Sequence, residues 1–236
     1  SPNNQPFVGY GAFAHKGGIH VSALLKDSAT YEHINPEDVG NRRRVLVSEL
    51  AGISNLLYKA KELKLDVNSY DAQTRAVIKQ IKELENQGFQ YEGADGSLEL
   101  LLRKAFGQYD EFFKLENLKL IMEKSEDKDI TAEAIIKLTI GEKTFHTAAE
   151  GDGPVNALDN SIRKALNEVY PEISRMHLSD YKVRVLNGNK GTGAKVRVLI
   201  DSVDDTRQWS TVGVSENIIE ASYQAIVDSI NYMLMR

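Results

Sequence analysis

An internal repeat constrains the fold of this chain more than any other feature. The stretch FHTAAEGDGPVNALDNSI (residues 145–162) aligns without gaps with WSTVGVSENIIEASYQAI (residues 209–226). Thr147 matches Thr211, and in both stretches a two-residue alternation changes to a helical period at the same place. Such self-similarity indicates two copies of one supersecondary unit. We therefore expect a single repeat domain of two βββα units.

Alternating apolar residues predict three strands before each of the two helices. The expected strands cover residues 118–122, 134–140, 143–149, 181–186, 194–203 and 208–214. The first helix follows the GDGP segment and has apolar residues from Val155 to Val169, and the second covers residues 218–233. We place the repeat domain at residues 109–236, with its units at about 109–172 and 173–236. Two like units side by side also suggest a sheet that can pack against another copy of itself.

Residues 46–108 have a helical period throughout and predict a small helical subdomain. The expected helices start at Ser48, at Ser69 or Asp71, and at Ser97; the last two end at Gly88 and Gly107. Apolar residues of the first helix, from Leu50 to Leu63, recur every three or four positions and form one buried stripe. Residues 1–45 are rich in Gly, Pro, Asn and Asp, with one short helix expected at residues 20–26. The fold class is therefore α+β.

Composition excludes several classes of protein. The chain has 236 residues, a net charge of −5 and no basic stripe interleaved with aromatic residues, so nucleic acid is not an expected partner. It has no cysteine, which excludes disulfides and thiolate metal sites and fits a cytoplasmic location. No apolar run is long enough to span a membrane. The first residue is Ser1 and not Met, which suggests that residues upstream were removed.

The stretch GAFAHKGGIHVSALLKDSATYE (residues 11–32) has the composition of an active-site segment. It contains His15, His20 and Tyr31 around a pair of glycines. Histidine titrates near neutral pH, and glycine lets the backbone approach a ligand. On one helix the two histidines would point about 140° apart, so a two-histidine metal site is a weak interpretation. A glycine turn with locally packed histidines explains the pattern as well as catalysis does.

Two further segments also allow two interpretations. In GDGP (residues 151–154) Asp152 can cap a helix that starts at Pro154, or the free N–H groups of that helix can bind an anion. The residues alone favour the cap. The run Arg42-Arg43-Arg44 can meet an anionic substrate or an acidic surface, but such a run is more often solvated.

Three longer segments carry a resemblance to a known family. The segment GAFAHKGGIHVSALLKDSATYEHINPEDVGN, followed by RRRVLVSELAGISNL, resembles the region after the catalytic barrel in the 2-isopropylmalate, homocitrate and citramalate synthases. The segments HTAAEGDGPVNALDNSIRKAL, DYKVRVL and TVGVSENIIEASYQAIVDSINYML are similar to the effector-binding dimerisation domain of the same family, most of all to its citramalate synthase branch. The resemblance covers essentially the whole chain.

The resemblance implies an acyltransferase that condenses acetyl-CoA with a 2-oxo acid, with pyruvate favoured. It assigns acid–base work to His20, the second histidine of HKGGIH, and places Tyr31 of ATYE nearby; His15 takes a supporting role. A histidine suits proton transfer because its pKa lies near the operating pH, and a tyrosine hydroxyl can relay a proton. By the same resemblance, residues 1–45 form a lid-like linker over the partner subunit's barrel.

The resemblance also implies what this chain lacks. The family holds a divalent metal with an Asp and an HxH pair in a (β/α)₈ barrel, and this sequence contains no HxH. Such a barrel needs about 250 residues, which helices and the repeat domain already occupy here. We therefore expect no barrel, no metal and no turnover in this chain by itself. His20 and Tyr31 would be catalytic only beside the barrel.

The resemblance finally implies a homodimer regulated by a branched-chain amino acid, with isoleucine favoured and leucine possible. The effector-site residues that it assigns are Gly151, Asp152, Gly153, Pro154 and Val155, with Tyr181 as a looser candidate. An amino acid offers a carboxylate to the helix N–H groups, and we expect its ammonium to pair with Asp152. A 2-isopropylmalate synthase, a free-standing amino-acid sensor and a metal-dependent hydrolase that uses His15 and His20 stay open as alternatives.

Overall fold

The computed structural model describes residues 5–9, 11–15, 18–24, 27, 31–45, 53–65, 67, 72–126, 129–186 and 188–236. These residues form two compact units. The first contains residues up to Glu92 together with Leu101–Gln108, and the second contains Gly93–Leu100 and Tyr109–Arg236. Three expected helix starts lie outside the described residues: Ser48, Ser69 and Asp71. The same is true of Leu50, of Gly17 in the glycine pair, and of Lys26 at the end of the short helix expected at residues 20–26. The boundary that we expect between residues 45 and 46 stays a prediction.

The first unit consists of short helices and one small sheet. Its elements are β1 (Ala14–His15), α1 (Gly18–Leu24), the 3₁₀ helix η2 (Pro36–Val39), β2 (Arg44–Val45), α2 (Ile53–Glu62), α3 (Ala72–Gln87) and η3 (Tyr91–Gly93), which reaches into the second unit. Strands β1 and β2 pair in parallel, with Ala14 opposite Arg44 and His15 opposite Val45. Val21 of α1 and Leu56 of α2 are completely buried and anchor the two helices. Helix α4 (Asp95–Ala105) contributes its last residues to this unit.

The second unit contains the repeat. Its first half is β3 (Lys114–Glu123), β4 (Thr131–Ile140), β5 (Lys143–Gly151) and α5 (Pro154–Leu166); its second half is β6 (His177–Val185), β7 (Val196–Val203), β8 (Gln208–Ser215) and α6 (Ile218–Leu234). The 3₁₀ helices η4 (Pro171–Arg175) and η5 (Gly188–Gly193) complete the connections. Each half forms an antiparallel three-stranded sheet, in the orders β3-β4-β5 and β6-β7-β8. The expected βββα order is confirmed.

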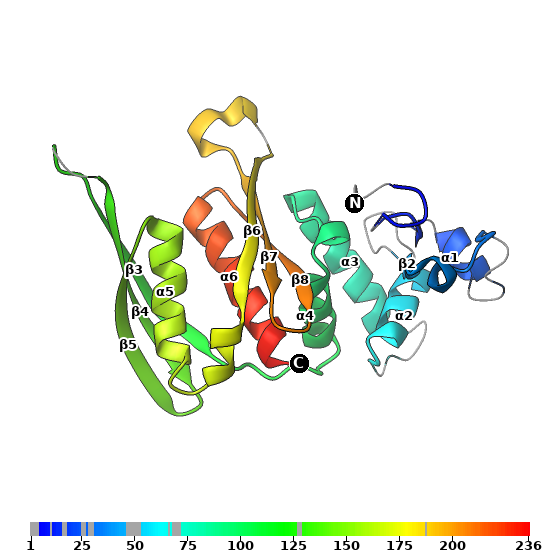
Figure 1. The fold of residues 1–236 in the computed structure, drawn as a ribbon, viewed down its shortest axis with the longest axis horizontal. Helices are drawn as coiled ribbons and strands as arrows, with labels where there is room; N and C mark the ends of the chain where they lie inside the picture. Colours follow the sequence, from blue (N-terminus) through cyan, green and yellow to red (C-terminus); the bar gives the residue numbers. More distant parts are fainter. Residues whose placement is uncertain are drawn as a thin grey trace. The chain divides into compact units, whose positions relative to one another are not determined.

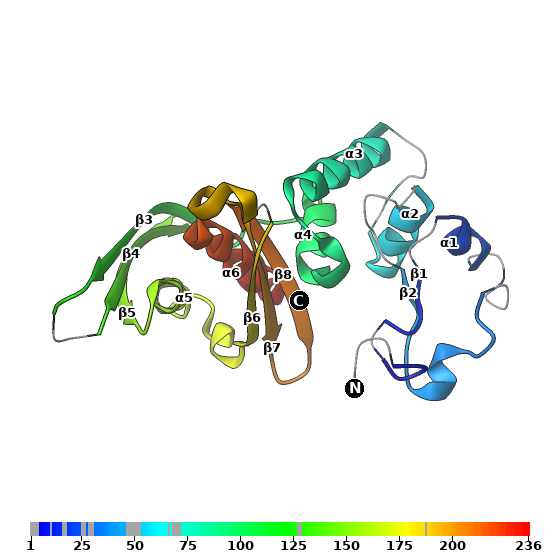
Figure 2. The same cartoon turned by 90° about the horizontal axis from the view of Figure 1, so that it is seen from above.

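Helices α5 and α6 lie between the two sheets of the second unit (Figures 1 and 2). Alternate residues of the central strands face the helices: Ile136 and Leu138 on β4, and Val198 and Ile200 on β7. All four are completely buried, as the two-residue period predicts. One hydrophobic core therefore joins both halves of the repeat.

Two equivalent hydrogen bonds show that the halves are structurally related. The hydroxyl of Thr147 donates to the carbonyl of Ser161 (3.0 Å), which ties β5 to α5. In the second half Thr211 donates to the carbonyl of Ala225 (2.7 Å), which ties β8 to α6. In both halves the threonine and the residue that accepts its hydrogen bond are 14 positions apart in the sequence. The gapless alignment of the sequence is therefore reproduced in the contacts.

Side chains cover the outer edge of β8. The backbone N–H of Ser210 donates to the carboxylate of Asp95 (3.0 Å), and that of Val212 donates to the hydroxyl of Ser97 (3.0 Å). The N–H of Val214 donates to the side-chain carbonyl of Gln224 (3.0 Å). An edge strand with free N–H groups can pair with another chain, and these side chains prevent such pairing at β8.

Most predicted elements are present, with bounds that differ by a few residues. Helix α4 starts at Asp95, two positions before the expected Ser97, and the side chains of both residues accept hydrogen bonds from N–H groups of β8. The glycines expected to end helices, Gly88 and Gly107, have positive φ angles of 116° and 67°. No helix among the described residues has the length and apolar character needed to cross a membrane.

Candidate functional site

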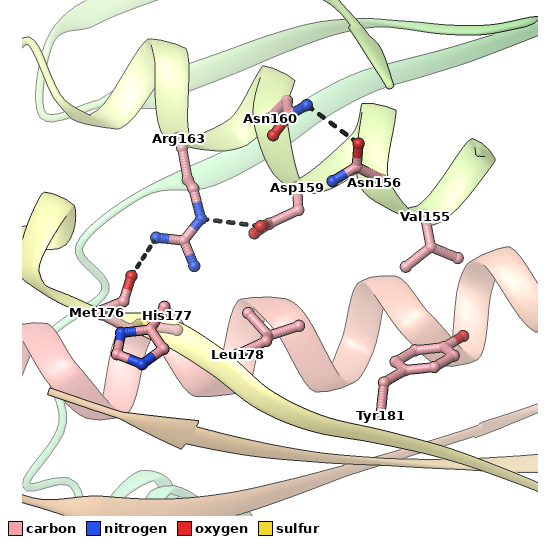
Figure 3. Close-up of a pocket in the computed structure, with 9 residues that line it drawn as sticks. All are labelled: Val155, Asn156, Asp159, Asn160, Arg163, Met176, His177, Leu178 and Tyr181. Atoms are coloured by element: carbon pink, nitrogen blue, oxygen red, sulfur yellow. Dashed lines mark hydrogen bonds and ion pairs between the residues drawn. The ribbon is translucent and has the colours of Figure 1, made fainter. Parts of the chain in front are cut away.

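A cavity of about 460 Å³ lies between helix α5 and the start of strand β6. Helix α5 contributes Val155, Asn156, Asp159, Asn160 and Arg163, and the other side consists of Met176, His177, Leu178 and Tyr181 (Figure 3). Ligand pockets typically have volumes of about 300–1,000 Å³, so this cavity is large enough for an amino acid. The α5 side is polar except for Val155, and the other side is largely apolar except for His177.

A charged pair on α5 forms the polar side of the cavity. Arg163 Nε donates to Asp159 Oδ2 (2.9 Å), and Arg163 Nη1 donates to the carbonyl of Met176 (2.9 Å), as Figure 3 shows. Both side chains are largely buried, at 17% and 16% exposed. Within the described part of the chain, Asp159 Oδ1 and Arg163 Nη2 are buried and have no hydrogen-bond partner. Buried polar atoms without a partner are costly, and a ligand with both charges could satisfy both atoms.

Tyr181 forms part of the apolar side. Its hydroxyl lies 2.8 Å from the Oγ of Ser222 on α6, and Ser222 in turn donates to the carbonyl of Ile218 (2.6 Å). These contacts fix the position of the ring, which lines the cavity together with Leu178 and Val155. The side chains of this wall suit an aliphatic group.

The GDGP segment directly precedes the helix that lines the cavity, but none of its four residues is among the residues that line it. Gly153, and not Asp152, is the N-cap of α5, and it provides no side-chain cap; the sequence-based expectation that Asp152 caps the helix is wrong. Asp152 is exposed and donates its backbone N–H to Asn156 Oδ1 (3.1 Å). A Cβ atom on Gly151 would lie 2.3 Å from the backbone nitrogen of Ala157, so only glycine allows β5 to approach α5 this closely. Pro154 starts the helix, as expected.

The predicted effector residues are therefore divided between two positions. Val155 and Tyr181 line the cavity, whereas Gly151, Asp152, Gly153 and Pro154 form the turn before it. Sequence reasoning missed Asp159 and Arg163. Their i, i+4 spacing is typical of a helical ion pair and could have drawn attention to them. His177 was also missed, because nothing in its strand pattern distinguishes it.

The first unit brings two of the predicted catalytic residues together. The rings of His20 and Tyr31 stack, with centroids 4.3 Å apart and an interplanar angle of 25°. Both side chains are exposed, Tyr31 at 45%. His20 lies on α1, and Tyr31 lies in the segment between α1 and η2. An exposed imidazole beside a phenol hydroxyl has the groups that proton transfer requires.

His15 lies in a separate, buried charged cluster. Its Nε2 lies 3.0 Å from Oε1 of Glu32, whose side chain is only 3% exposed. Arg43 donates from Nε to both carboxylate oxygens of Glu32 (2.9 and 3.0 Å) and also from Nη2. Burial by itself raises the pKa of Glu32, but hydrogen bonds from Arg43 and His15 outweigh it and hold that pKa below its usual value. The expectation of a solvated arginine run is thus wrong for Arg43, whereas its contact with an anionic substrate stays a prediction.

The described residues contain no group of three or more His, Cys, Asp or Glu side chains that could hold a metal ion. His15 and His20 have different partners, Glu32 and Tyr31, so the described structure does not bring the two histidines to one site. The metal-dependent hydrolase therefore has no structural support among these residues.

Comparison with known proteins decides the family. Residues 92–234 match the family described as the LeuA allosteric (dimerisation) domain. The chain belongs to this family. Residues 7–88 match a second family, described as homocitrate synthase post-HMGL domain-like. The two matches meet near residue 90, where the second compact unit begins.

Individual relatives agree with this assignment. The chain is 52% identical to an (R)-citramalate synthase of Geobacter sulfurreducens over 99% of its length, and 50% identical to that of Aquifex aeolicus over 100% of its length. Its identity to the (R)-citramalate synthase of Synechocystis sp. is 47% over 98% of its length. The chain spans 45%, 45% and 43% of the lengths of these three relatives. The resemblance noted in the sequence is thereby confirmed.

Proposed function

We propose that this chain is the C-terminal regulatory portion of an acyl-CoA-condensing synthase, an (R)-citramalate synthase, and that it binds a branched-chain amino acid in the cavity between α5 and β6. The observation that carries the binding proposal is that Asp159 and Arg163 line that cavity and that each has a buried atom without a hydrogen-bond partner, Oδ1 and Nη2 respectively. The enzymatic part of the proposal is supported by the named relatives.

The cavity offers a partner for each part of an amino-acid zwitterion. Asp159 Oδ1 would accept from the ammonium group, and Arg163 Nη2 would donate to the carboxylate. The aliphatic side chain would lie against Val155, Leu178 and the ring of Tyr181. Asp159 lines the cavity and Asp152 does not, so the ammonium role passes in this proposal from Asp152 to Asp159.

In the whole enzyme we propose acetyl-CoA and pyruvate as substrates. His20 would exchange the proton in the condensation, and the Tyr31 hydroxyl would hold or relay it; their stacked rings support this pairing. We propose that the divalent metal, which would polarise the keto group, belongs to the barrel of the whole enzyme. Inhibition by isoleucine would then be a coupling between the cavity and that distant active site.

We also propose that the chain forms a homodimer through the sheet that contains β6. Val183 and Val185 on this edge strand are 42% and 54% exposed, although they lie on the same face as the buried Val198 of β7. A second copy could cover them. Sedimentation of the Val183→Glu variant should show dissociation to monomers, whereas an exchange at the exposed Lys143 of β5, Lys143→Glu, should leave the dimer intact.

The test of the effector site is unfolding of this chain with isoleucine, leucine or valine. Trp209 is the only tryptophan and lies buried in the second unit, so its fluorescence reports on the domain with the cavity. A ligand at a hundredfold excess over its Kd adds about 2.7 kcal/mol, or roughly 5–10 °C in Tm. Stabilisation by isoleucine is expected, and a preference for leucine would favour a 2-isopropylmalate synthase. No response to any of the three would overturn the site.

Two matched variants identify the charged partner. Asp159→Asn keeps the shape of the side chain but removes its charge, and we expect it to weaken isoleucine binding at least tenfold. Asp152→Asn makes the same exchange outside the cavity wall and should bind normally. The reverse result would return the ammonium role to Asp152.

A further inference from the structure

Glu32 is a buried carboxylate to which neither the motif nor the proposed reaction gives a role. Its side chain is 3% exposed and accepts hydrogen bonds from Arg43 on one side and from His15 on the other. Arg43 also interacts with Tyr58 of α2. Glu32 therefore connects three separate segments: strand β1, the residue before β2, and, through Arg43, helix α2.

The position of Glu32 in the chain connects this cluster to the stacked rings. Tyr31 directly precedes Glu32, and the two side chains have opposite environments, because Glu32 is buried and Tyr31 is 45% exposed. The Glu32 carboxylate is held by several charge-assisted hydrogen bonds, which are shorter and stronger than neutral ones. Fixing Glu32 fixes the backbone of Tyr31, and with it the place where the phenol ring meets His20.

We propose that Glu32 is the positioning residue of this motif: its buried carboxylate holds His15 directly and holds Tyr31 through the backbone, so that the Tyr31 ring stacks on His20. The chemical purpose of the stack rests on the proposed function, but the positioning itself does not. Glu32 acts through other residues and does not need to contact the substrate. A single carboxylate thus organises all three residues that the motif singles out.

The experiment is an NMR measurement on the 236-residue chain with labelled histidine rings. The chain has five histidines, and a stacked tyrosine ring displaces the signals of His20 upfield. The Tyr31→Leu variant defines the position without the stack. We expect Glu32→Gln to lose most of the upfield displacement. Glu37→Gln, the same exchange at an exposed position of η2, should keep it.

Removing Glu32 alone leaves the partly buried Arg43 without its carboxylate, which can unfold the segment and would obscure the result. The double variant Glu32→Gln/Arg43→Met therefore replaces both charges with neutral side chains of similar length. It should restore the dispersion of the other histidine signals but not the displacement of His20. A displacement that survives in this folded double variant would overturn the positioning role.

Kinetics of the whole enzyme separate this inference from the proposed function. A misplaced catalytic pair should lower kcat about 100-fold with little change in the KM for acetyl-CoA. If Glu32→Gln loses the displacement of His20 but keeps normal kcat, Glu32 positions the rings and the catalytic role of His20 and Tyr31 is wrong. If the displacement and kcat are both unchanged, the positioning role is wrong and the proposed function stands.

Discussion

The rings of Tyr31 and His20 lie stacked with centroids 4.3 Å apart, although eleven positions of the sequence separate the two residues. This contact brings the HKGGIH and ATYE segments together. The sequence motif alone does not show that these two segments meet. It brings a titratable imidazole next to a hydroxyl on an exposed surface of the first unit. Because of this contact, substitutions at Tyr31 can test the role of its ring separately from the role of its hydroxyl.

Tyr31→Phe keeps the ring but removes the hydroxyl, and Tyr31→Leu removes both. If the hydroxyl relays a proton, both variants should lower kcat of the whole enzyme by about 100-fold or more, and His20→Asn should lower it by about 10²–10⁴-fold. Steady-state kinetics with acetyl-CoA and pyruvate provide the measurement. His33→Asn, at an exposed position of the same segment, is the control and should retain activity. Full activity of Tyr31→Phe would limit Tyr31 to a packing role.

Gly213 should be essential for the second half of the repeat. A Cβ atom at this position of β8 would lie 1.9 Å from the carbonyl oxygen of Ala221 on α6, so strand and helix would have to separate. We expect Gly213→Ala to destabilise the second unit by about 1–3 kcal/mol or more. Urea unfolding monitored by Trp209 fluorescence measures this change. Gly193→Ala, where nothing lies within 4 Å of the added atom, should stay within about 0.5 kcal/mol of the original.

The repeat was predictable because its signal is local. Buried residues such as Ile136 and Ile200 alternate along their strands, and the periods of α5 and α6 follow directly from the sequence. The charged clusters were not predictable in this way. Glu32 meets His15 and Arg43 only because β1 and β2 pair in parallel, and sequence spacing alone does not specify that pairing.

The N-cap of α5 and the lining of the cavity could not be predicted from the sequence either. Asp152 has a residue type and a place suited to an N-cap, yet the chain turns so that Gly153 takes the cap and Asn156 accepts the N–H of Asp152. The cavity needs α5 and β6 from different halves of the repeat, so its wall could not be listed from either half. Spacing could indicate the Asp159–Arg163 pair but not that Asp159 Oδ1 and Arg163 Nη2 are buried without a hydrogen-bond partner.

Ser97 should protect the edge of β8. Its hydroxyl accepts from the buried N–H of Val212 (3.0 Å) and donates to Asp228 (2.7 Å). Ser97→Ala leaves that N–H without this acceptor, and we expect a loss of about 1–3 kcal/mol. Hydrogen exchange should show faster exchange of the Val212 amide in the variant. Ser179→Ala, which removes an exposed hydroxyl on β6, should change neither the stability nor the exchange rate of the Val212 amide. If the Val212 amide exchanges at the same rate in Ser97→Ala as in the original chain, other contacts protect this edge.

Asp204 should make the stability of the second unit depend on pH. It lies in the turn between β7 and β8, where its carboxylate accepts from the backbone N–H groups of Thr206 and Arg207 (both 2.8 Å) and from the Arg207 guanidinium. Burial alone raises the pKa of Asp204, but these hydrogen bonds outweigh it and lower the pKa to about 2 from 3.8. The folded state therefore favours the ionised form more than the unfolded state does.

The sign of the effect follows from linkage between protonation and folding. Because the folded pKa is the lower one, Asp204 contributes its full stabilisation above pH 3.8 and loses it as the pH falls toward about 2. Asp204→Asn should cost about 1–2 kcal/mol at pH 7, and its difference from the original chain should shrink between pH 4 and 2. Urea unfolding across this pH range measures the difference. The exposed neighbour Asp205 provides the control, because Asp205→Asn should change the free energy of unfolding little at any pH. If the stability difference between Asp204→Asn and the original chain does not change with pH, the shape of the Asp204 side chain and not its charge stabilises the turn.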